Sequence, residues 1–340
     1  MGLNKRLISS EAAAAVVPTN TDNFDVVTYA GNNGTNPITS LDFQPDLVWI
    51  KNRDNANDHF LTDSVRGAGK YVQSNNTNAE DTTSRFNSFD SNGFTVSTDT
   101  ALLNNTAYDY VAWCFKGGGS AVSNTDGSIT STVSANQDAG FSIVKYTGNG
   151  GTTQSIGHGL SSAPEMVIFK RTDAAPNWFV FEKSGASTRR FEGLNTTNAS
   201  TSDTFFTPSS STITWSGTTA DFNGSGREYI MYCFHSVNGY QKVGSYTGGS
   251  SNNTITTGFQ PRFLLLKRTD STGSGRNWSI LDSVRTPSDP REDYLLANTS
   301  DAEATNTSYD IEFDSDGFNI TSTSSPYNQS GGTYIYLAIA

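Results

Sequence analysis

Three stretches of the chain share one arrangement of apolar and polar positions. In each, a proline and one polar residue precede four consecutive apolar residues and a lysine, at residues 45–51, 164–170 and 261–267. Four apolar residues in a row, starting just after a proline and ending at a charge, predict a short strand that is buried on both faces. The recurrence of this pattern predicts three copies of one structural module.

Other strand signals surround each run. An alternating strand with a glycine turn precedes it, at residues 24–31, 141–148 and 240–248, and an aromatic strand closes each copy, at 110–115, 229–234 and 334–339. The first and third copies contain Asn92-Gly93 and Asp316-Gly317 between aromatic residues, which predicts hairpins. The second copy lacks such a pair after Phe206, so we expect it to be divergent and without this hairpin.

About seven strand signals in roughly 100 residues are typical of an antiparallel β-sandwich. The sequence therefore predicts an all-β protein with three tandem β-sandwich modules of jelly-roll or lectin-like type. The expected divisions are an N-terminal attachment arm at 1–22, a first module at 23–119, a linker at 120–139, a divergent second module at 140–236 and a third module at 237–340.

The two segments outside the modules differ in character. The arm carries Lys5-Arg6 and one possible apolar helical stripe, with a disordered tail as the alternative. The stripe consists of Leu3, Leu7, Ile8, Ala12 and Val16. The linker is rich in Ser, Thr, Asn and Gly, which predicts a flexible connection. Because almost no spacer separates the second and third modules, we expect these two to form a rigid pair while the first swings.

Composition narrows the class of protein. The chain of 340 residues holds 43 Ser, 43 Thr and 31 Asn, and only 16% of it is charged, which excludes a helical bundle. Its net charge of -11 argues against a nucleic-acid partner. No apolar run reaches the roughly 20 residues of a membrane-spanning helix. Polar residues interrupt the N-terminal apolar stretch, so we expect no signal peptide and synthesis in a cytoplasm.

The residues that usually carry chemistry are few. The histidines, His59, His158 and His235, do not have metal-ligand spacing, and we expect surface or hydrogen-bonding roles for them. Cys114 and Cys233 occupy equivalent aromatic strands and are predicted to be buried, free and inert. We therefore assign no catalytic, metal-binding or cofactor-binding residue and expect no enzyme activity.

Two glycine loops and one acidic turn resemble ligand loops only superficially. Residues 31–34 and 148–151 lack the Lys-Ser/Thr of a phosphate loop, and a turn explains their glycines. The turn at 314–317 could offer oxygens to Ca²⁺, but it lacks the terminal glutamate of a calcium loop, and a hairpin accounts for its glycine.

Charged pairs recur at fixed spacing. They are Lys51 with Asp54, Lys170 with Asp173, Lys267 with Asp270, Asp63 with Arg66, and Asp282 with Arg285. We interpret them as ion pairs that tie strand ends, with a repeated ligand-binding cluster as the alternative. The aromatic residues of the strands, including Trp49 and Trp113, are predicted core residues. Trp178 and Trp278 are predicted core residues too, although a tryptophan at a sandwich rim could also stack on sugars.

The ordered set of motifs resembles a known module. Proline with four apolar residues and lysine, then Asp-Ser-Val-Arg, Asn-Thr, Ala-Glu, Phe-Asp-Ser-Asn-Gly-Phe and Tyr-Val-Ala-Trp-Cys-Phe, is similar to a repeat found in tail-fibre-like and other structural proteins of tailed bacteriophages, particularly marine ones. The similarity covers the chain from Phe24 to Ala340, and the second copy departs from it at the Asp-Ser-Val-Arg, Ala-Glu and hairpin positions.

This resemblance implies a component of the virion surface. The expected function is that of a tail fibre or receptor-binding protein that contacts a host-surface polysaccharide, and the alternative is a purely architectural capsid decoration or tail adaptor. We expect contacts to other virion proteins through the arm, and a homo-oligomer such as the trimers common in phage fibres. The second module, with 7 basic and 7 acidic residues, is the expected face between subunits because repulsion is weakest there.

The expected role of the arm gives a first prediction. Deletion of residues 1–20 should abolish incorporation of the protein into particles, because the arm provides the attachment. Immunoblotting of purified particles measures this, and undiminished incorporation would refute the arm.

Overall fold

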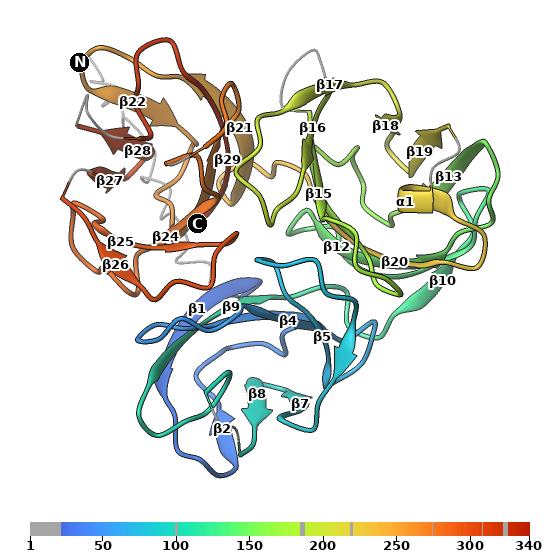
Figure 1. Ribbon diagram of the computed structural model, residues 1–340, viewed down its shortest axis with the longest axis horizontal. Coiled ribbons are helices and arrows are strands. Elements are labelled where there is room, and N and C mark those ends of the chain that lie inside the picture. The colour runs from blue at the N-terminus through green and yellow to red at the C-terminus, as the bar shows by residue number, and fades with distance from the viewer. Residues whose placement is uncertain are drawn as a thin grey trace, which may run out of the picture.

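The protein consists of three β-sandwich modules arranged around a common centre (Figure 1). The computed structural model describes residues 22–98, 101–183, 188–217, 220–273, 275–307, 309–321 and 326–340. The predicted arm lies outside these residues, apart from Asp22. In the part of the chain that is described, no helix is long and apolar enough to cross a membrane.

The strands of the three modules correspond one to one. The first module contains β1 (Phe24–Ala30), β2 (Asn36–Ile38), β3 (Leu47–Asn52), β4 (Phe60–Asp63), β5 (Lys70–Val72), β6 (Asp81–Thr82), β7 (Phe86–Asp90), β8 (Gly93–Val96) and β9 (Asp109–Phe115). The second contains β12 (Phe141–Thr147), β13 (Thr153–Gly157), β14 (Met166–Arg171), β15 (Phe179–Glu182), β16 (Thr188–Glu192), β17 (Thr201–Asp203), β18 (Phe206–Pro208), β19 (Thr212–Ser216), the short helix α1 (Ala220–Asn223) and β20 (Glu228–Phe234). The third contains β21 (Gln241–Thr247), β22 (Asn253–Thr256), β23 (Phe263–Arg268), β24 (Ser279–Asp282), β25 (Asp293–Leu296), β26 (Ala304–Thr305), β27 (Ile311–Asp314), β28 (Gly317–Ile320) and β29 (Thr333–Ile339).

Each module pairs a large antiparallel sheet with a small one. The large sheet of the first module has the order β1-β9-β3-β4-β5-β6 and the small one β2-β8-β7, and the other two modules repeat these orders. The prediction of three tandem antiparallel sandwiches is confirmed.

The large sheets are apolar on both faces. In β3, Val48 and Ile50 face the small sheet of their own module, whereas Leu47 and Trp49 face the other modules, and all four are buried. The corresponding strands β14 and β23 are divided in the same way. This confirms the prediction that the run after each proline is buried on both faces, and it identifies the second face as the contact between modules.

The outer faces of the three large sheets form one shared core. Residues from all three modules join a single hydrophobic cluster, among them Trp49, Phe115, Ile168, Phe234, Leu265 and Leu337. A small apolar cavity of about 10 Å³ lies at its centre and is lined by side chains from every module. Burial of this surface is the main force that holds the modules together.

Backbone hydrogen bonds close the arrangement into a ring. The amide of Glu80 donates to Thr172 O at 2.8 Å, the amide of Ser200 donates to Thr269 O at 2.8 Å, and the amide of Glu303 donates to Arg53 O at 2.7 Å. The same loop of each module thus reaches the next module, and the third module returns to the first. The prediction that the first module swings is therefore wrong, because the ring leaves no module free.

The expected linker is also structured. Residues 120–139 contain β10 (Val122–Asn124) and β11 (Ser131–Asn136), which extend the large sheet of the second module through β12. Gly117 and Gly118 permit this close contact, since a Cβ at Gly118 would lie 2.4 Å from Ala135 O. The prediction of a flexible linker was wrong because these glycines serve tight backbone packing, and the segment that follows pairs as strands.

The divergent second module retains the hairpin that its sequence was expected to lack. Strands β18 and β19 pair antiparallel, with Phe206 opposite Trp215. The amide of Ser209 donates to Thr212 O at 2.8 Å and closes the turn without glycine. The register of this hairpin depends on pairing of β19 with β13 and on packing of Phe206 and Trp215. The absence of a glycine turn in the sequence was therefore not sufficient to predict the absence of the hairpin.

The shared core predicts cooperative unfolding of the entire ring. Replacement of the buried Leu265 by Ala should lower the free energy of unfolding by about 2–5 kcal/mol because it opens a cavity at the contact of all three modules. Calorimetry should show one transition, shifted as a whole to lower temperature. Separate transitions, with only the third module affected, would contradict the shared core.

Candidate functional site

The cysteines and histidines are structural groups. Cys114 and Cys233 are buried and free, as predicted, and burial raises the pKa of the Cys233 thiol to about 12, which disfavours the reactive thiolate at neutral pH. All three histidines are buried and hydrogen-bonded, so the expected hydrogen-bonding role is correct and a surface position is not. Within the described residues, no group of histidine, cysteine or carboxylate side chains could hold a metal ion.

His59 joins the first module to the third. Its Nδ1 accepts a hydrogen bond from Trp49 Nε1 at 2.8 Å, which leaves the proton on Nε2, 3.0 Å from Leu296 O. Burial in this position lowers the pKa of His59 to about 3. The equivalent residues Trp178 and Trp278 donate across the other two junctions, to Gln73 O at 2.9 Å and Gly193 O at 3.2 Å.

The two Asp-Arg motifs are buried ion pairs at module junctions. Arg66 Nε lies 2.6 Å from Asp63 Oδ2, and Tyr232 of the second module donates to the same oxygen at 2.9 Å. Arg285 and Asp282 form the same pair at 2.6 Å, and Trp113 Nε1 of the first module donates to Asp282 Oδ2 at 3.0 Å. The ion-pair interpretation is therefore correct for these motifs.

The lysines of the repeat do not pair with the predicted aspartates. Lys170 Nζ donates to Thr77 O at 2.9 Å and to Pro176 O at 2.8 Å, and Lys267 Nζ donates to Thr197 O at 3.3 Å and to Arg276 O at 2.6 Å. Lys51 Nζ likewise donates to two carbonyl oxygens, of Asn52 and Asn55. Desolvation lowers the pKa of Lys267 to about 7.

Two of the predicted aspartates pair with arginines instead. Asp173 pairs with Arg171 at 2.7 Å, and Asp270 pairs with Arg268 at 2.6 Å.

A repeated asparagine organises the glycine loops, and it was not predicted from the sequence. Asn104, Asn223 and Asn328 are buried, and each precedes the first tyrosine of its closing strand by six residues. Asn104 Nδ2 donates to Gly34 O at 2.7 Å, and Asn223 Nδ2 donates to Gly151 O at 2.9 Å. This constant spacing was the signal that could have revealed them. The turn interpretation of these loops is supported, and residues 314–317 form the β27–β28 hairpin as expected.

The five tryptophans are all buried, so none lies at a sandwich rim. Trp178 and Trp278 belong to the shared core, as predicted. Among the described residues, the exposed large apolar side chains are Val122 and Phe205.

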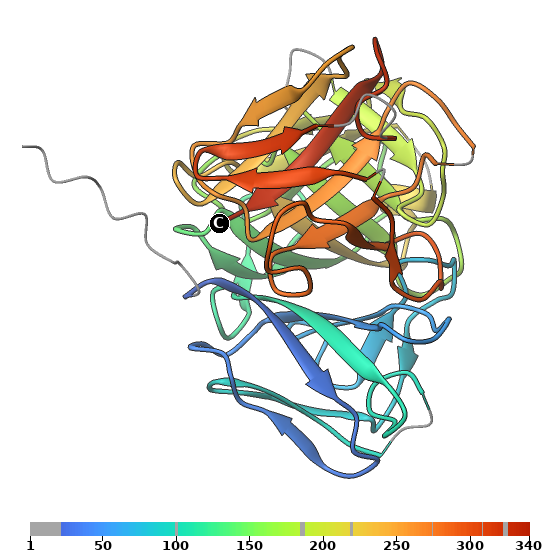
Figure 2. The same cartoon turned by 90° about the vertical axis from the view of Figure 1, so that its left-hand side faces the viewer.

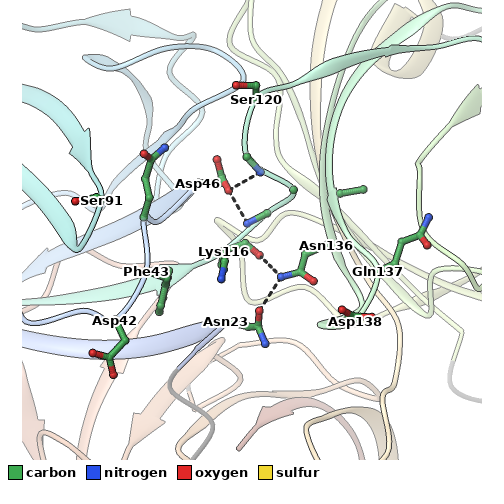
Figure 3. Close-up of a pocket in the computed structure, with 15 residues that line it drawn as sticks. Asn23, Asp42, Phe43, Asp46, Ser91, Lys116, Ser120, Asn136, Gln137 and Asp138 are labelled. Atoms are coloured by element: carbon green, nitrogen blue, oxygen red, sulfur yellow. Dashed lines mark hydrogen bonds between the residues drawn. The ribbon is translucent and has the colours of Figure 1, made fainter.

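A polar cleft lies beside the junction of the first and second modules (Figure 3). It has a volume of about 920 Å³ and is lined by Asn23, Asp42, Phe43, Gln44, Asp46, Ser91, Lys116, Gly117, Gly118, Gly119, Ser120, Ala135, Asn136, Gln137 and Asp138. The β10–β11 segment supplies one wall, so the cleft exists at this junction because the connecting chain is structured.

Hydrogen bonds fix the floor of the cleft. Asp46 Oδ2 accepts from the amides of Gly117 at 2.8 Å and Gly119 at 3.2 Å (Figure 3). Asp46 Oδ1 accepts from Ser64 Oγ at 2.6 Å. Asn136 Nδ2 donates to Asn23 Oδ1 at 2.9 Å. Burial is the main cause that raises the pKa of Asp46. The backbone of residues 117–119 is therefore held rigidly against the first module.

The chemistry of the cleft is that of a binding surface. Its walls offer hydroxyl, amide and carboxylate groups, and Lys116 is the one cation among its fifteen lining residues, against Asp42, Asp46 and Asp138. This balance suits a ligand or protein segment rich in hydrogen-bond donors and disfavours an anion. Sequence reading missed the cleft because its residues come from segments that meet only after folding.

The chain matches the model of a protein family. Residues 19–340 match the model of the domain of unknown function DUF7483, and the protein belongs to this family. The match treats the three modules as one domain, in keeping with their shared core. No curated protein matches the sequence.

The junction at His59 gives a prediction that links packing to pH. The other modules have Ile168 or Leu265 at the position of Trp49, so the double variant W49L/H59W reproduces the pattern of the third module. In H59W alone, overpacking against Trp49 should lower the free energy of unfolding at pH 7 by about 1–3 kcal/mol. The double variant should recover most of this free energy. Urea denaturation measures both.

The same variant isolates the titration of His59. Below its ordinary pKa of 6.5 the histidine takes up a proton in the unfolded chain, but not in the folded protein until about pH 3. The free energy of unfolding of the native protein therefore falls as the pH falls. Between pH 7 and pH 4 it should decrease by about 3 kcal/mol more than the free energy of unfolding of W49L/H59W does. Parallel pH profiles for the two proteins would contradict the neutral, buried histidine.

Proposed function

We propose that this protein is a non-catalytic structural component of a tailed-bacteriophage virion, and that it acts as a tail fibre or receptor-binding protein that contacts a host-surface glycan. The observation that carries the proposal is the closed ring of three equivalent sandwiches, built by one chain, whose motifs resemble those of phage structural repeats. Such a ring is a rigid body that presents loops and sheet edges on its outside.

The use of the titratable side chains supports a role without catalysis. The buried Asp-Arg pairs, the histidines and the lysines of the repeat are engaged with partners that hold the fold together. A catalytic site would need such groups in a cleft with perturbed pKa values. In the cleft of Figure 3, burial raises the pKa of Asp46, but three hydrogen-bond donors of the protein itself occupy its carboxylate oxygens.

A specific observation also favours contacts to other virion proteins. The cleft is lined by Asn23, directly before β1, and the start of β1 and the C-terminus lie at the same end of the molecule (Figure 2). A partner attached through residues 1–22 would be adjacent to the cleft. The architectural function, as a capsid decoration or tail adaptor, uses this end alone.

Adsorption of the purified full-length protein to host cells separates the two functions. A receptor-binding protein should adsorb saturably, and purified host polysaccharide should compete for it. Absence of adsorption, together with stoichiometric placement against capsid or tail proteins in a particle reconstruction, would establish the architectural function. Purified particles that lack the chain in a mass-spectrometric inventory would refute both.

A further inference from the structure

Phe205 is an exposed aromatic residue at a point where the repeat is broken. Its side chain lies between β17 and β18 and is 41% exposed. The alignment of the first residues of β7, β18 and β27 places Arg85 and Asp310 at the equivalent positions of the other modules. The second module thus presents a phenyl ring to solvent at a position where the other two modules have a charged side chain.

The position of the ring is fixed by its surroundings. Asp203 Oδ1 accepts from the amides of Phe205 at 2.9 Å and Phe206 at 2.7 Å, and Phe205 O accepts from the amide of Ser216 at 2.9 Å. One edge of the ring faces Gly217, where an added Cβ would lie 3.3 Å from Cδ1. The backbone that carries the exposed ring is therefore held by the fold, which limits the conformational entropy lost when a ligand binds.

Polar side chains surround the ring. The guanidinium of Arg190 lies 5.9 Å from the ring centroid and pairs with Glu192 at 3.3 Å and with Asp203 at 3.6 Å. The Glu192 side chain is 54% exposed. Exposed hydroxyl groups come from Thr201, which lies opposite Arg190 in the sheet, from Thr204, and from Ser216, whose Oγ donates to Phe205 O at 3.4 Å. An apolar ring face, one partly exposed cation, one exposed carboxylate and several hydroxyls therefore share one small surface.

We propose that this surface binds a neutral hexose unit of a polysaccharide, whose apolar C–H face packs on Phe205 while its hydroxyl groups bind Glu192 and Arg190. This inference rests on the proposed contact with a host glycan. The charges favour a neutral sugar, because the two carboxylates already compensate Arg190. A protein partner would be expected to contact a cluster of apolar residues, whereas Phe205 is the single exposed aromatic residue of the described surface.

An array of purified bacterial capsular and O-antigen polysaccharides tests the site. The full-length protein should bind at least one of them, and F205R, which introduces the residue of the first module, should weaken that binding about tenfold or more. E192Q should weaken it less, because one hydrogen bond changes from a charged to a neutral acceptor. The unfolding temperature of F205R should equal that of the native protein, because the side chain at this position is exposed.

Two further variants make the result specific. V122S removes the other exposed large apolar side chain and should bind as the native protein does, whereas D138N alters the cleft of Figure 3 and tests that surface as the alternative glycan site. Loss of binding by D138N with native binding by F205R would overturn the assignment and move the glycan to the cleft while preserving the proposed function. Failure of the native protein to bind any polysaccharide or host cell would refute the glycan contact itself and the site with it.

Discussion

The structure depends on the fact that the large sheet of each module is apolar on both faces. One face is covered by the small sheet of the same module, but the other, with side chains such as Trp49, Ile168 and Leu265, has no cover within its own module. An apolar surface of this kind is unfavourable in water. Three modules related by a closed ring cover one another's faces completely, whereas an open chain of modules would leave two faces exposed. The ring is therefore the consequence of the two-sided burial.

The junctions between modules combine this burial with buried polar groups that occur as matched pairs. Asp63 and Arg66 meet Tyr232, and Asp282 and Arg285 meet Trp113. The second module has Glu182 at the position of these aspartates, and this buried carboxylate pairs with Arg189 of the same module at 2.8 Å. The third-module residue that corresponds to Tyr232 and Trp113 is Leu337, which offers no hydrogen bond to a carboxylate. Because a buried charge without a partner is costly, the second module keeps an ion pair at this position although its sequence motif differs.

The core and the surface of the molecule differ in how closely they follow the repeat. The shared core and the junctions use positions that recur. The cleft of Figure 3 combines recurring positions, which also line a smaller pocket of about 370 Å³ at Glu165 and His235 of the second module, with the connecting segment, and the area around Phe205 uses residues that do not recur. The cleft requires the connecting segment with β10 and β11, which occurs once in the described chain. Breaking the repeat on the outside leaves the core intact, because these side chains do not contribute to it. A threefold fold thereby acquires surfaces without threefold symmetry.

The sequence by itself determined the repeat, the all-β class, the buried strands after each proline, the free cysteines and the Asp-Arg pairs. These features are encoded locally or by constant spacing, as with the buried strand Leu47–Ile50 and the pair Asp63–Arg66. Only the tertiary structure decided which groups meet across modules: that Lys170 donates to Thr77 O, that His59 bridges to Leu296, and that residues 117–120 and 135–138 line a cleft beside the first module. It also decided that Phe206 pairs with Trp215 without a glycine turn. The spacing of residues within one module does not predict which residues of a neighbouring module they contact. Contacts between modules are set by burial of the second face of each large sheet, and that burial exists only once the three faces have come together.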